Sequence, residues 1–232
     1  MLNSYKNSRE LNMTDTRIHV YLMPGMATNS TIFKNIALPE AQFKIHLLEW
    51  FVPEKGMSLE AYAMTMIGHI NHENPVLIGV SFGGFLVQEI AKHIAVKKVI
   101  IISSVKGRSE MPKRLIFAKY TKIHKLLPTG LVNNLDLLAK YAFGEMVTQR
   151  IELYKEYLTV KDKYYLDWSI DQIVNWDQEH HLKDIIHIHG DKDAVFPIQY
   201  IQDCLCVKNG THTMIIHRYK WFNERLPAII LQ

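Results

Sequence analysis

The sequence is poor in cysteine, with only Cys204 and Cys206 among its 232 residues. Two thiols separated by one residue in a strand are poorly placed to bond to each other, so we expect no disulfide between them. We interpret both as packed thiols without a redox or metal-binding role.

Long apolar runs are also missing. No run approaches the ~18 residues of a membrane span, so we expect no integral membrane segment. The first 16 residues are polar and lack the apolar stretch of a secretory signal. We therefore interpret residues 1–16 as a flexible N-terminal segment and expect the protein to be cytoplasmic. The absence of repeats and low-complexity segments argues against solenoid and disordered proteins.

The excess of positive charge is small. Lysine and arginine number 27 against 23 acidic residues, a formal charge of +4, which does not indicate a nucleic-acid partner. Hydrophobic residues make up 48% of the chain, enough for a sizeable core. The length fits one domain with room for an insertion.

Apolar runs alternate with helical patterns along most of the chain, which is typical of a mostly parallel sheet covered by helices. Helices are expected after the N-cap residue Ser58, over residues 82–93, and from near Thr213 onward. Strands are expected at residues 18–23, 44–48, 75–80, 98–103, 185–189 and 204–208. The pattern predicts an α/β fold, a three-layer α/β/α sandwich with about six strands.

The alternation stops between residues 105 and 184, where helical patterns take over. Apolar residues recur at helical spacing over residues 147–158 and 166–174. This stretch is far longer than one crossover, so we interpret 105–184 as a helical lid inserted before the fifth strand, and 17–104 with 185–232 as the core. A set of ordinary crossover helices is the alternative.

The start of this segment is basic and carries Phe117 and Tyr120 among its cations. Such a face could meet an anionic substrate or an acidic membrane surface, but a solvated helix face is the favoured interpretation. The basic residues are Lys106, Arg108, Lys113, Arg114, Lys119, Lys122 and Lys125.

The strongest chemical signal is Gly79-Val80-Ser81-Phe82-Gly83, which fits G-x-S-x-G between an apolar strand and an apolar-faced helix. A serine on such a sharp turn has an exposed hydroxyl, and small residues two positions away on either side avoid a collision across the turn. The helix N-terminus favours a developing oxyanion. Ser81 is therefore the candidate nucleophile.

A serine nucleophile needs a base and a group that orients the base. Asp193 lies in the loop after strand 185–189, at the same sheet edge as Ser81, and Asp191 is its competitor. His212 follows the Asn209-Gly210 turn and comes last in the order Ser, Asp, His. We predict His212 as the base and Asp193 as its partner.

An oxyanion hole in this arrangement takes one N–H from the residue after the nucleophile and one from a loop after an earlier strand. Phe82 supplies the first. Gly25 lets the loop after strand 18–23 pass close to the reacting carbonyl, and Met26 supplies the second. A plain strand-ending turn is the alternative.

These residues together resemble the α/β-hydrolase superfamily, from about Ile18 to the C-terminus. The resemblance implies a compact serine esterase-like enzyme in which Ser81, Asp193 and His212 form the triad and Met26 and Phe82 the oxyanion hole. One departure is Pro24-Gly25, where His-Gly is usual. Glycine is retained, so the hole is expected to form.

We therefore expect a serine hydrolase acting on a small to medium, mostly apolar ester or related acyl compound, with no cofactor or metal. C–C bond hydrolysis, lyase or acyltransferase chemistry on the same triad remains open, as does slow-turnover ligand binding. The oligomeric state is not predicted. A zinc site is suggested by His180, His181, His187 and His189. The lack of matching ligand spacing favours packed or surface histidines instead.

Overall fold

The computed structural model describes residues 15–126, 157, 159 and 162–232. Nearly all of the expected N-terminal segment 1–16 and almost all of the helix expected over 147–158 lie outside these residues. Within the part of the chain that is described, no helix is both long and apolar enough to cross a membrane.

Six strands form one sheet in the order β2-β1-β3-β4-β5-β6. Every neighbouring pair is parallel; Val76 lies opposite Lys98, for example, and Val80 opposite Ile102. The prediction of about six mostly parallel strands is confirmed, with bounds shifted by one or two residues. The strands are β1 (Ile18–Met23), β2 (Phe43–Leu47), β3 (Val76–Val80), β4 (Lys98–Ile102), β5 (Ile186–Gly190) and β6 (Leu205–Val207).

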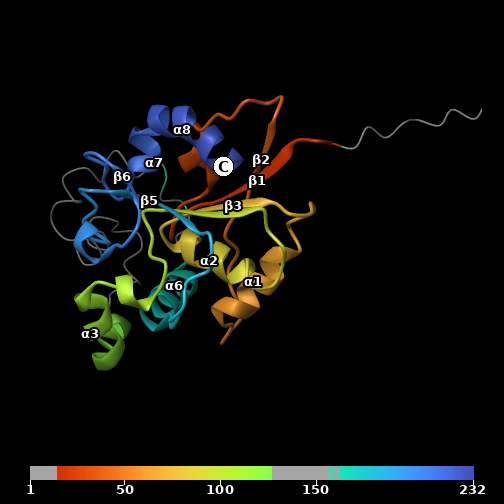
Figure 1. The fold of residues 1–232 in the computed structure, drawn as a ribbon. Helices are drawn as coiled ribbons and strands as arrows, with labels where there is room; N and C mark the ends of the chain where they lie inside the picture. The colour runs from red at the N-terminus through yellow and green to blue at the C-terminus, as the bar shows by residue number, and fades with distance from the viewer. Residues whose placement is uncertain (1–14, 127–156, 158, 160–161) are drawn as a thin grey trace, which may run out of the picture.

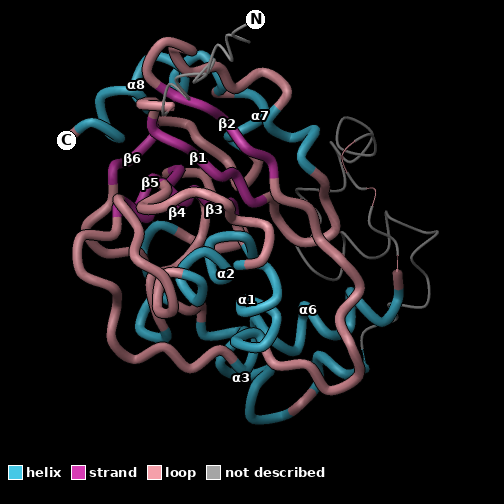
Figure 2. Tube along the Cα trace, turned by 90° about the vertical axis from the view of Figure 1, so that its right-hand side faces the viewer, coloured by secondary structure: helices cyan, strands magenta, loops and turns pink. Residues whose placement is uncertain are grey.

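Helices cover both faces of the sheet, because the central strands are apolar on both sides (Figure 1, Figure 2). One face carries α1 (Leu59–Ile67), α2 (Phe82–Ile90) and α6 (Lys163–Asn175), and the other α7 (Met214–His217) and α8 (Tyr219–Leu231). Two separate clusters of buried residues lie on the two faces. The three-layer prediction is confirmed.

Local signals account for the helix starts. The Ser58 side chain accepts a hydrogen bond from the Ala61 N–H and caps α1, as expected. The prediction of a single final helix was wrong, because Arg218, at φ −102° and ψ 19°, separates α7 from α8. This break turns the chain so that α8 buries Phe222 and Leu226 against the sheet.

The cysteine prediction was also wrong in part. Cys204 lies just before β6 and is half-buried, whereas Cys206 is exposed. The reason is that β6 is a three-residue strand at the edge of the sheet, and the side chain of its middle residue is exposed.

Between β4 and β5, the described residues form helices and no strand. These are α3 (Lys113–Thr121), α6 and the short 3-10 segments η2 (Arg108–Glu110) and η3 (Ile123–Leu126). The remaining short segments are η1 (Ser30–Phe33) and η6 (Ile198–Tyr200). Helices and 3-10 segments are therefore the only regular elements among the described residues of this region, and the loop at 176–185 has neither.

Candidate active site

Ser81 occupies the turn between β3 and α2, at the carboxyl edge of the sheet. Its backbone has φ 52° and ψ −120°, a strained conformation for a residue with a side chain. The turn is fixed by hydrogen bonds from the Ser81 N–H to the Ile102 carbonyl (2.9 Å) and from the Ser104 hydroxyl to the Ser81 carbonyl (2.8 Å). The serine side chain remains partly exposed to solvent.

Gly79 and Gly83 allow this turn to close. A Cβ on Gly79 would lie 2.2 Å from the Gly83 carbonyl oxygen, and one on Gly83 would lie 2.4 Å from that of Pro24. Both contacts are with backbone, which cannot rotate aside. The G-x-S-x-G pattern therefore reflects a real steric requirement.

We expect Gly83→Ala to lower the free energy of unfolding by about 3 kcal/mol, because the helix must move away from the Pro24 carbonyl. Hydrolytic activity, if present, falls as well, since the turn carries Ser81. Gly68→Ala is the control: Gly68 ends α1 at φ −59°, an ordinary helical conformation. Urea denaturation of both variants measures the difference, and equal stability of the two would contradict this steric account.

His212 contacts the Ser81 hydroxyl, and Asp193, from a separate loop, contacts the other ring nitrogen of His212. His212 Nε2 lies 2.9 Å from Ser81 Oγ, and His212 Nδ1 lies 2.9 Å from Asp193 Oδ2 and 3.1 Å from Oδ1. The Asp193 side chain is fully buried, whereas that of His212 is 16% exposed. The three predicted residues are thus brought together, and the contacts run from Asp193 to His212 to Ser81.

Asp193 is held by the backbone of its own loop. Its Oδ1 accepts hydrogen bonds from the N–H groups of Val195 (2.8 Å) and Phe196 (2.9 Å). Burial raises the pKa of Asp193, but the charge of His212 and its hydrogen bond outweigh this, so the pKa lies below its ordinary value. Asp191, the competing acid, makes no such contact with His212 among the described residues.

Two further histidines stand behind the acid on β5. His189 Nε2 donates to the Phe196 carbonyl (2.7 Å) and lies 3.5 Å from Asp193 Oδ2. His187 Nε2 lies 3.1 Å from His189 Nδ1. Burial lowers the pKa of both, that of His187 to about 3, so both are neutral at pH 7. The expectation of packed histidines holds for this pair.

The buried His187 predicts a loss of stability in acid. Its pKa is about 3 when folded against ~6.5 when unfolded, so only the unfolded chain gains a proton between these values. The contribution is complete above pH ~6.5 and declines as the pH falls toward 3. We expect His187→Gln to reduce the slope of unfolding free energy against pH by up to about 1.4 kcal/mol per pH unit. Denaturation at pH 4, 5 and 7 measures it, and an unchanged slope would refute it.

The loop after β1 is anchored in an orientation that suits an oxyanion hole. The Gly25 carbonyl accepts hydrogen bonds from Trp50 Nε1 (2.9 Å) and Thr28 Oγ1 (2.9 Å). In a trans peptide the N–H points opposite to the carbonyl, so the Met26 N–H points away from Trp50. A Cβ on Gly25 would lie only 3.4 Å from Ser81 Cβ, so this peptide lies beside the serine.

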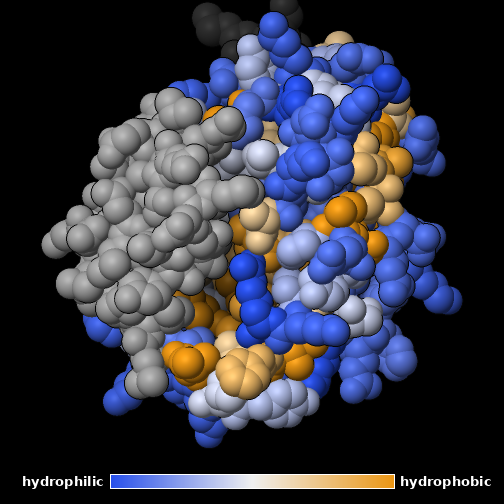
Figure 3. Space-filling model, turned by 90° about the vertical axis from the view of Figure 1, so that its left-hand side faces the viewer, coloured by the Kyte–Doolittle hydropathy of each residue, from blue (hydrophilic) through white to orange (hydrophobic). Residues whose placement is uncertain are grey.

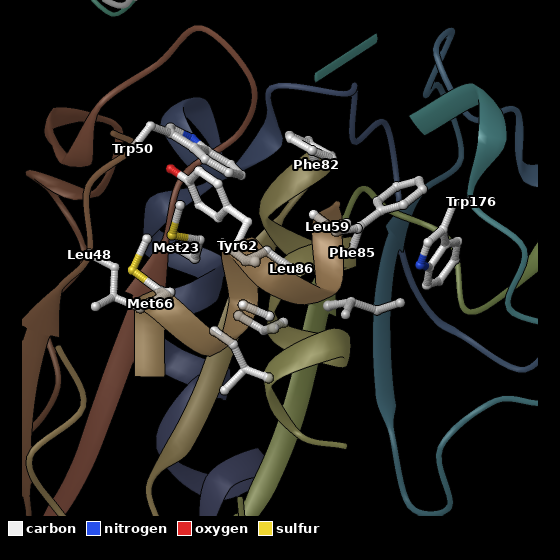
Figure 4. Packing of buried hydrophobic residues seen from close by; sticks show 14 of the residues in the cluster. Met23, Leu48, Trp50, Leu59, Tyr62, Met66, Phe82, Phe85, Leu86 and Trp176 are labelled. Carbon is white, nitrogen blue, oxygen red and sulfur yellow. The ribbon is translucent and has the colours of Figure 1, made fainter. Parts of the chain in front are cut away.

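The Trp50 side chain connects the loop after β1 to Phe82, a contact that the sequence did not reveal. Besides its bond to the Gly25 carbonyl, its ring stacks on Phe82 with centroids 4.9 Å apart and planes 6° apart (Figure 4). It therefore contacts Phe82 and the carbonyl of the peptide whose N–H belongs to Met26. No spacing rule points to it, although its place just after β2, at the same sheet edge, is a weak signal.

We expect Trp50→Phe to lower kcat about tenfold, equivalent to about 1.4 kcal/mol, because the Gly25 carbonyl loses a hydrogen bond while an aromatic ring remains. KM should change little. Trp176→Phe is the matched control, since it removes an indole hydrogen bond to the Glu89 carboxylate, near the end of α2 that is far from Phe82. Steady-state kinetics on one ester compares them; equal losses of kcat would remove Trp50 from the oxyanion site.

Aromatic side chains pack around Phe82 and His212. Trp168 on α6 meets the Phe82 ring edge-on at 5.8 Å, and Phe196 lies 5.7 Å from the His212 ring. In Figure 1, β1 begins beside the N-terminal trace and runs left, so the carboxyl edge faces left. Viewed from that side, hydrophobic residues gather next to the grey region (Figure 3). Aromatic rings thus lie next to Phe82 and His212.

The basic residues at the start of the segment between β4 and β5 do not form one solvated face. Arg114 donates to the Val195 carbonyl (2.7 Å), and Lys106 is buried and donates to the Gln202 carbonyl (2.7 Å). Arg108 and Lys119 share Asp177. The favoured solvated-face interpretation was therefore wrong for Lys106, which is buried, whereas Arg114 stays exposed. Arg114 connects α3 to the loop that carries Asp193.

Solved structures share this fold despite little sequence identity. An esterase from Exiguobacterium antarcticum is 17% identical to this chain. The match covers 94% of this chain and 93% of the esterase chain, with a TM-score of 0.66. A bromoperoxidase from Bacillus anthracis is 18% identical, with 93% and 92% covered and a TM-score of 0.65. A carboxylesterase from Nitrososphaera gargenis is 15% identical, with 93% and 91% covered and a TM-score of 0.67.

The chain has the α/β-hydrolase fold. No family model matches its sequence, and no curated protein does. At these identities the likeness establishes the α/β-hydrolase fold and leaves the activity to be argued from the site. The fold implied by the sequence resemblance is confirmed.

Proposed function

We propose that this α/β-hydrolase-fold protein is a serine hydrolase of the carboxylesterase type. The observation that carries the proposal is the unbroken line of contacts from Asp193 through His212 to the Ser81 hydroxyl. A hydroxyl 2.9 Å from an imidazole nitrogen, on a strained and partly exposed turn, meets the geometric requirement for an activated nucleophile.

The first half-reaction forms an acyl-enzyme. Ser81 Oγ attacks the acyl carbon while His212 Nε2 takes the hydroxyl proton, and the carbonyl electrons move onto its oxygen. The N–H groups of Met26 and Phe82 stabilise that oxyanion, and Asp193 stabilises the imidazolium. When the carbonyl re-forms, the C–O bond to the leaving alcohol breaks and His212 gives the alcohol its proton.

The second half-reaction uses water in the place of the alcohol. The oxygen of a water molecule attacks the acyl carbon while His212 takes a proton from that water. The oxyanion forms again at the same N–H groups. Collapse breaks the bond to Ser81 Oγ, which recovers its proton from His212, and the carboxylic acid leaves. The cycle uses only this chain's residues and water.

The substrate class follows from the surroundings of Ser81. Phe82, Phe196 and Trp168 present rings near the site, and hydrophobic residues gather on the face at this edge (Figure 3). A small to medium, mostly apolar acyl group fits these surroundings best. We also propose residues 105–184 as the lid, because Tyr165 and Trp168 of α6 pack in the cluster that contains Phe82. A cytoplasmic location remains part of the proposal.

A panel of p-nitrophenyl esters of graded acyl length tests this function. We expect hydrolysis of short and medium chains, with kcat/KM rising with apolar length and then falling when the pocket is full. Trace hydrolysis combined with tight ligand binding would instead favour the slow-turnover binding protein. The comparisons include both esterases and a bromoperoxidase, so they do not decide between reactions on one triad.

A further inference from the structure

Three histidines that are far apart in the sequence converge at the opposite end of the sheet from Ser81. His19 lies near the start of β1, His46 on β2, and His72 in the loop that leads into β3. One nitrogen from each ring can be chosen so that all three lie within 4.8 Å of one another. The side chain of His19 is 10% exposed, and His46 and His72 are half-buried.

The rings are in direct contact. His19 Nδ1 lies 2.9 Å from His46 Nε2, and the rings of His19 and His72 stack with centroids 3.5 Å apart. Nitrogens bound to one tetrahedral zinc at 2.0–2.1 Å stand about 3.3 Å apart. The His19–His46 separation of 2.9 Å is near this value, and all three nitrogens lie within 4.8 Å of one another, so rotation of the rings can bring them to one ion.

We propose that His19, His46 and His72 form a Zn²⁺-binding site, distinct from the site at Ser81. Three imidazoles and a water molecule make the four-coordinate set that zinc favours. The proposal departs from the expectation of no metal site, which considered only histidines that are close in sequence. It does not depend on the proposed hydrolase function.

Neighbouring side chains lie where they can orient the rings, as groups hydrogen-bonded to metal-ligating histidines do. His72 Nδ1 lies 2.6 Å from the Tyr21 hydroxyl, which also accepts a hydrogen bond from the Asn71 N–H (3.0 Å). This leaves Nε2 of His72 for the metal. His19 Nε2 lies 3.9 Å from Asp15 Oδ2, a carboxylate held by Arg17, while Nδ1 faces His46. A carboxylate or hydroxyl behind a ligating histidine is a recurring feature of metal sites.

Charged groups of both signs lie near the three rings. Lys44 and Arg17 are the nearby positive charges that oppose a cation, and Asp15 offsets them.

Binding has a defined structural cost and consequence. A metal lies in the plane of each imidazole it binds, so the stack of His19 on His72 must open. In return the ion connects β1, β2 and the loop before β3 at the amino edge of the sheet. Because the three nitrogens come together only in the folded chain, zinc stabilises the fold.

Equilibrium dialysis of the full chain against ZnCl₂, after removal of metal with a chelator, tests the site. We expect one tight zinc per wild-type chain and at least about 100-fold weaker binding for His72→Gln and for His46→Gln. His69→Gln is the matched control, because this exposed histidine lies three residues from His72 and outside the cluster; its binding should equal that of wild type. Zinc should raise the Tm of wild type and control only.

Two results would overturn the proposal. One is that wild type binds zinc no more tightly than His72→Gln and His46→Gln do. The other is that His69→Gln loses as much affinity as they do, which would indicate adventitious surface binding. The visible spectrum of the Co²⁺ form adds a direct readout, since a tetrahedral site absorbs far more strongly than hydrated Co²⁺. His72→Gln is in a loop and is expected to fold even if His46→Gln does not.

Discussion

His212→Ala is expected to lower kcat by about 10⁶-fold, to a residual rate supplied by substrate binding and the oxyanion site. The Ser81 hydroxyl then has no base within reach, because the only described imidazole nitrogen that contacts it is His212 Nε2 at 2.9 Å. Hydrolysis of a p-nitrophenyl ester over hours, with the spontaneous rate subtracted, measures the loss.

The control for this variant is His217→Ala. His217 lies five residues later, and its Nε2 contacts the Thr213 hydroxyl at 2.8 Å. Its kcat should match that of wild type. Because Ser81 and His212 act as one unit, the double variant with Ser81→Ala should be no slower than either single variant. Multiplicative losses would show that the two side chains do not act together.

Asp193→Asn is expected to lower kcat by about 10⁴-fold without unfolding the protein. The asparagine carbonyl can still accept the hydrogen bonds from the Val195 and Phe196 N–H groups. Its NH₂ group then faces His212 Nδ1 and donates to it, which moves the ring proton to Nε2. An imidazole with a proton on Nε2 cannot accept the proton of Ser81.

The matched control is Asp191→Asn, two residues earlier in the same loop, and we expect it to retain nearly full activity. A large loss for Asp191→Asn with little for Asp193→Asn would exchange the roles of the two acids. Near-ultraviolet circular dichroism of both variants separates a loss of fold from a loss of chemistry.

The parts of the fold with strong local signals were predictable. β3, the Ser81 turn and α2 follow from one apolar run, two glycines and one helical pattern, and all three were predicted within a few residues. The break at Arg218 was not predictable, because the apolar pattern continues across it and only packing of α8 against the sheet requires the turn.

The site likewise had residues that the sequence could predict and residues that it could not. Ser81, Asp193 and His212 each follow a strand at one sheet edge, so parallel topology brings them together once the strands are known. Trp50 was missed because its role depends on a contact with a backbone carbonyl 25 residues away. The cluster of His19, His46 and His72 was missed because no spacing in the sequence connects β1, β2 and the loop before β3.

Labelling with a fluorophosphonate, followed by mass spectrometry of the digested protein, tests the assignment of the nucleophile most directly. We expect one phosphonyl adduct per chain, located on Ser81, with no adduct on Ser81→Ala and far slower labelling of His212→Ala. An unlabelled but folded wild-type protein, or an adduct on any other residue, would contradict the assignment of Ser81 as the nucleophile.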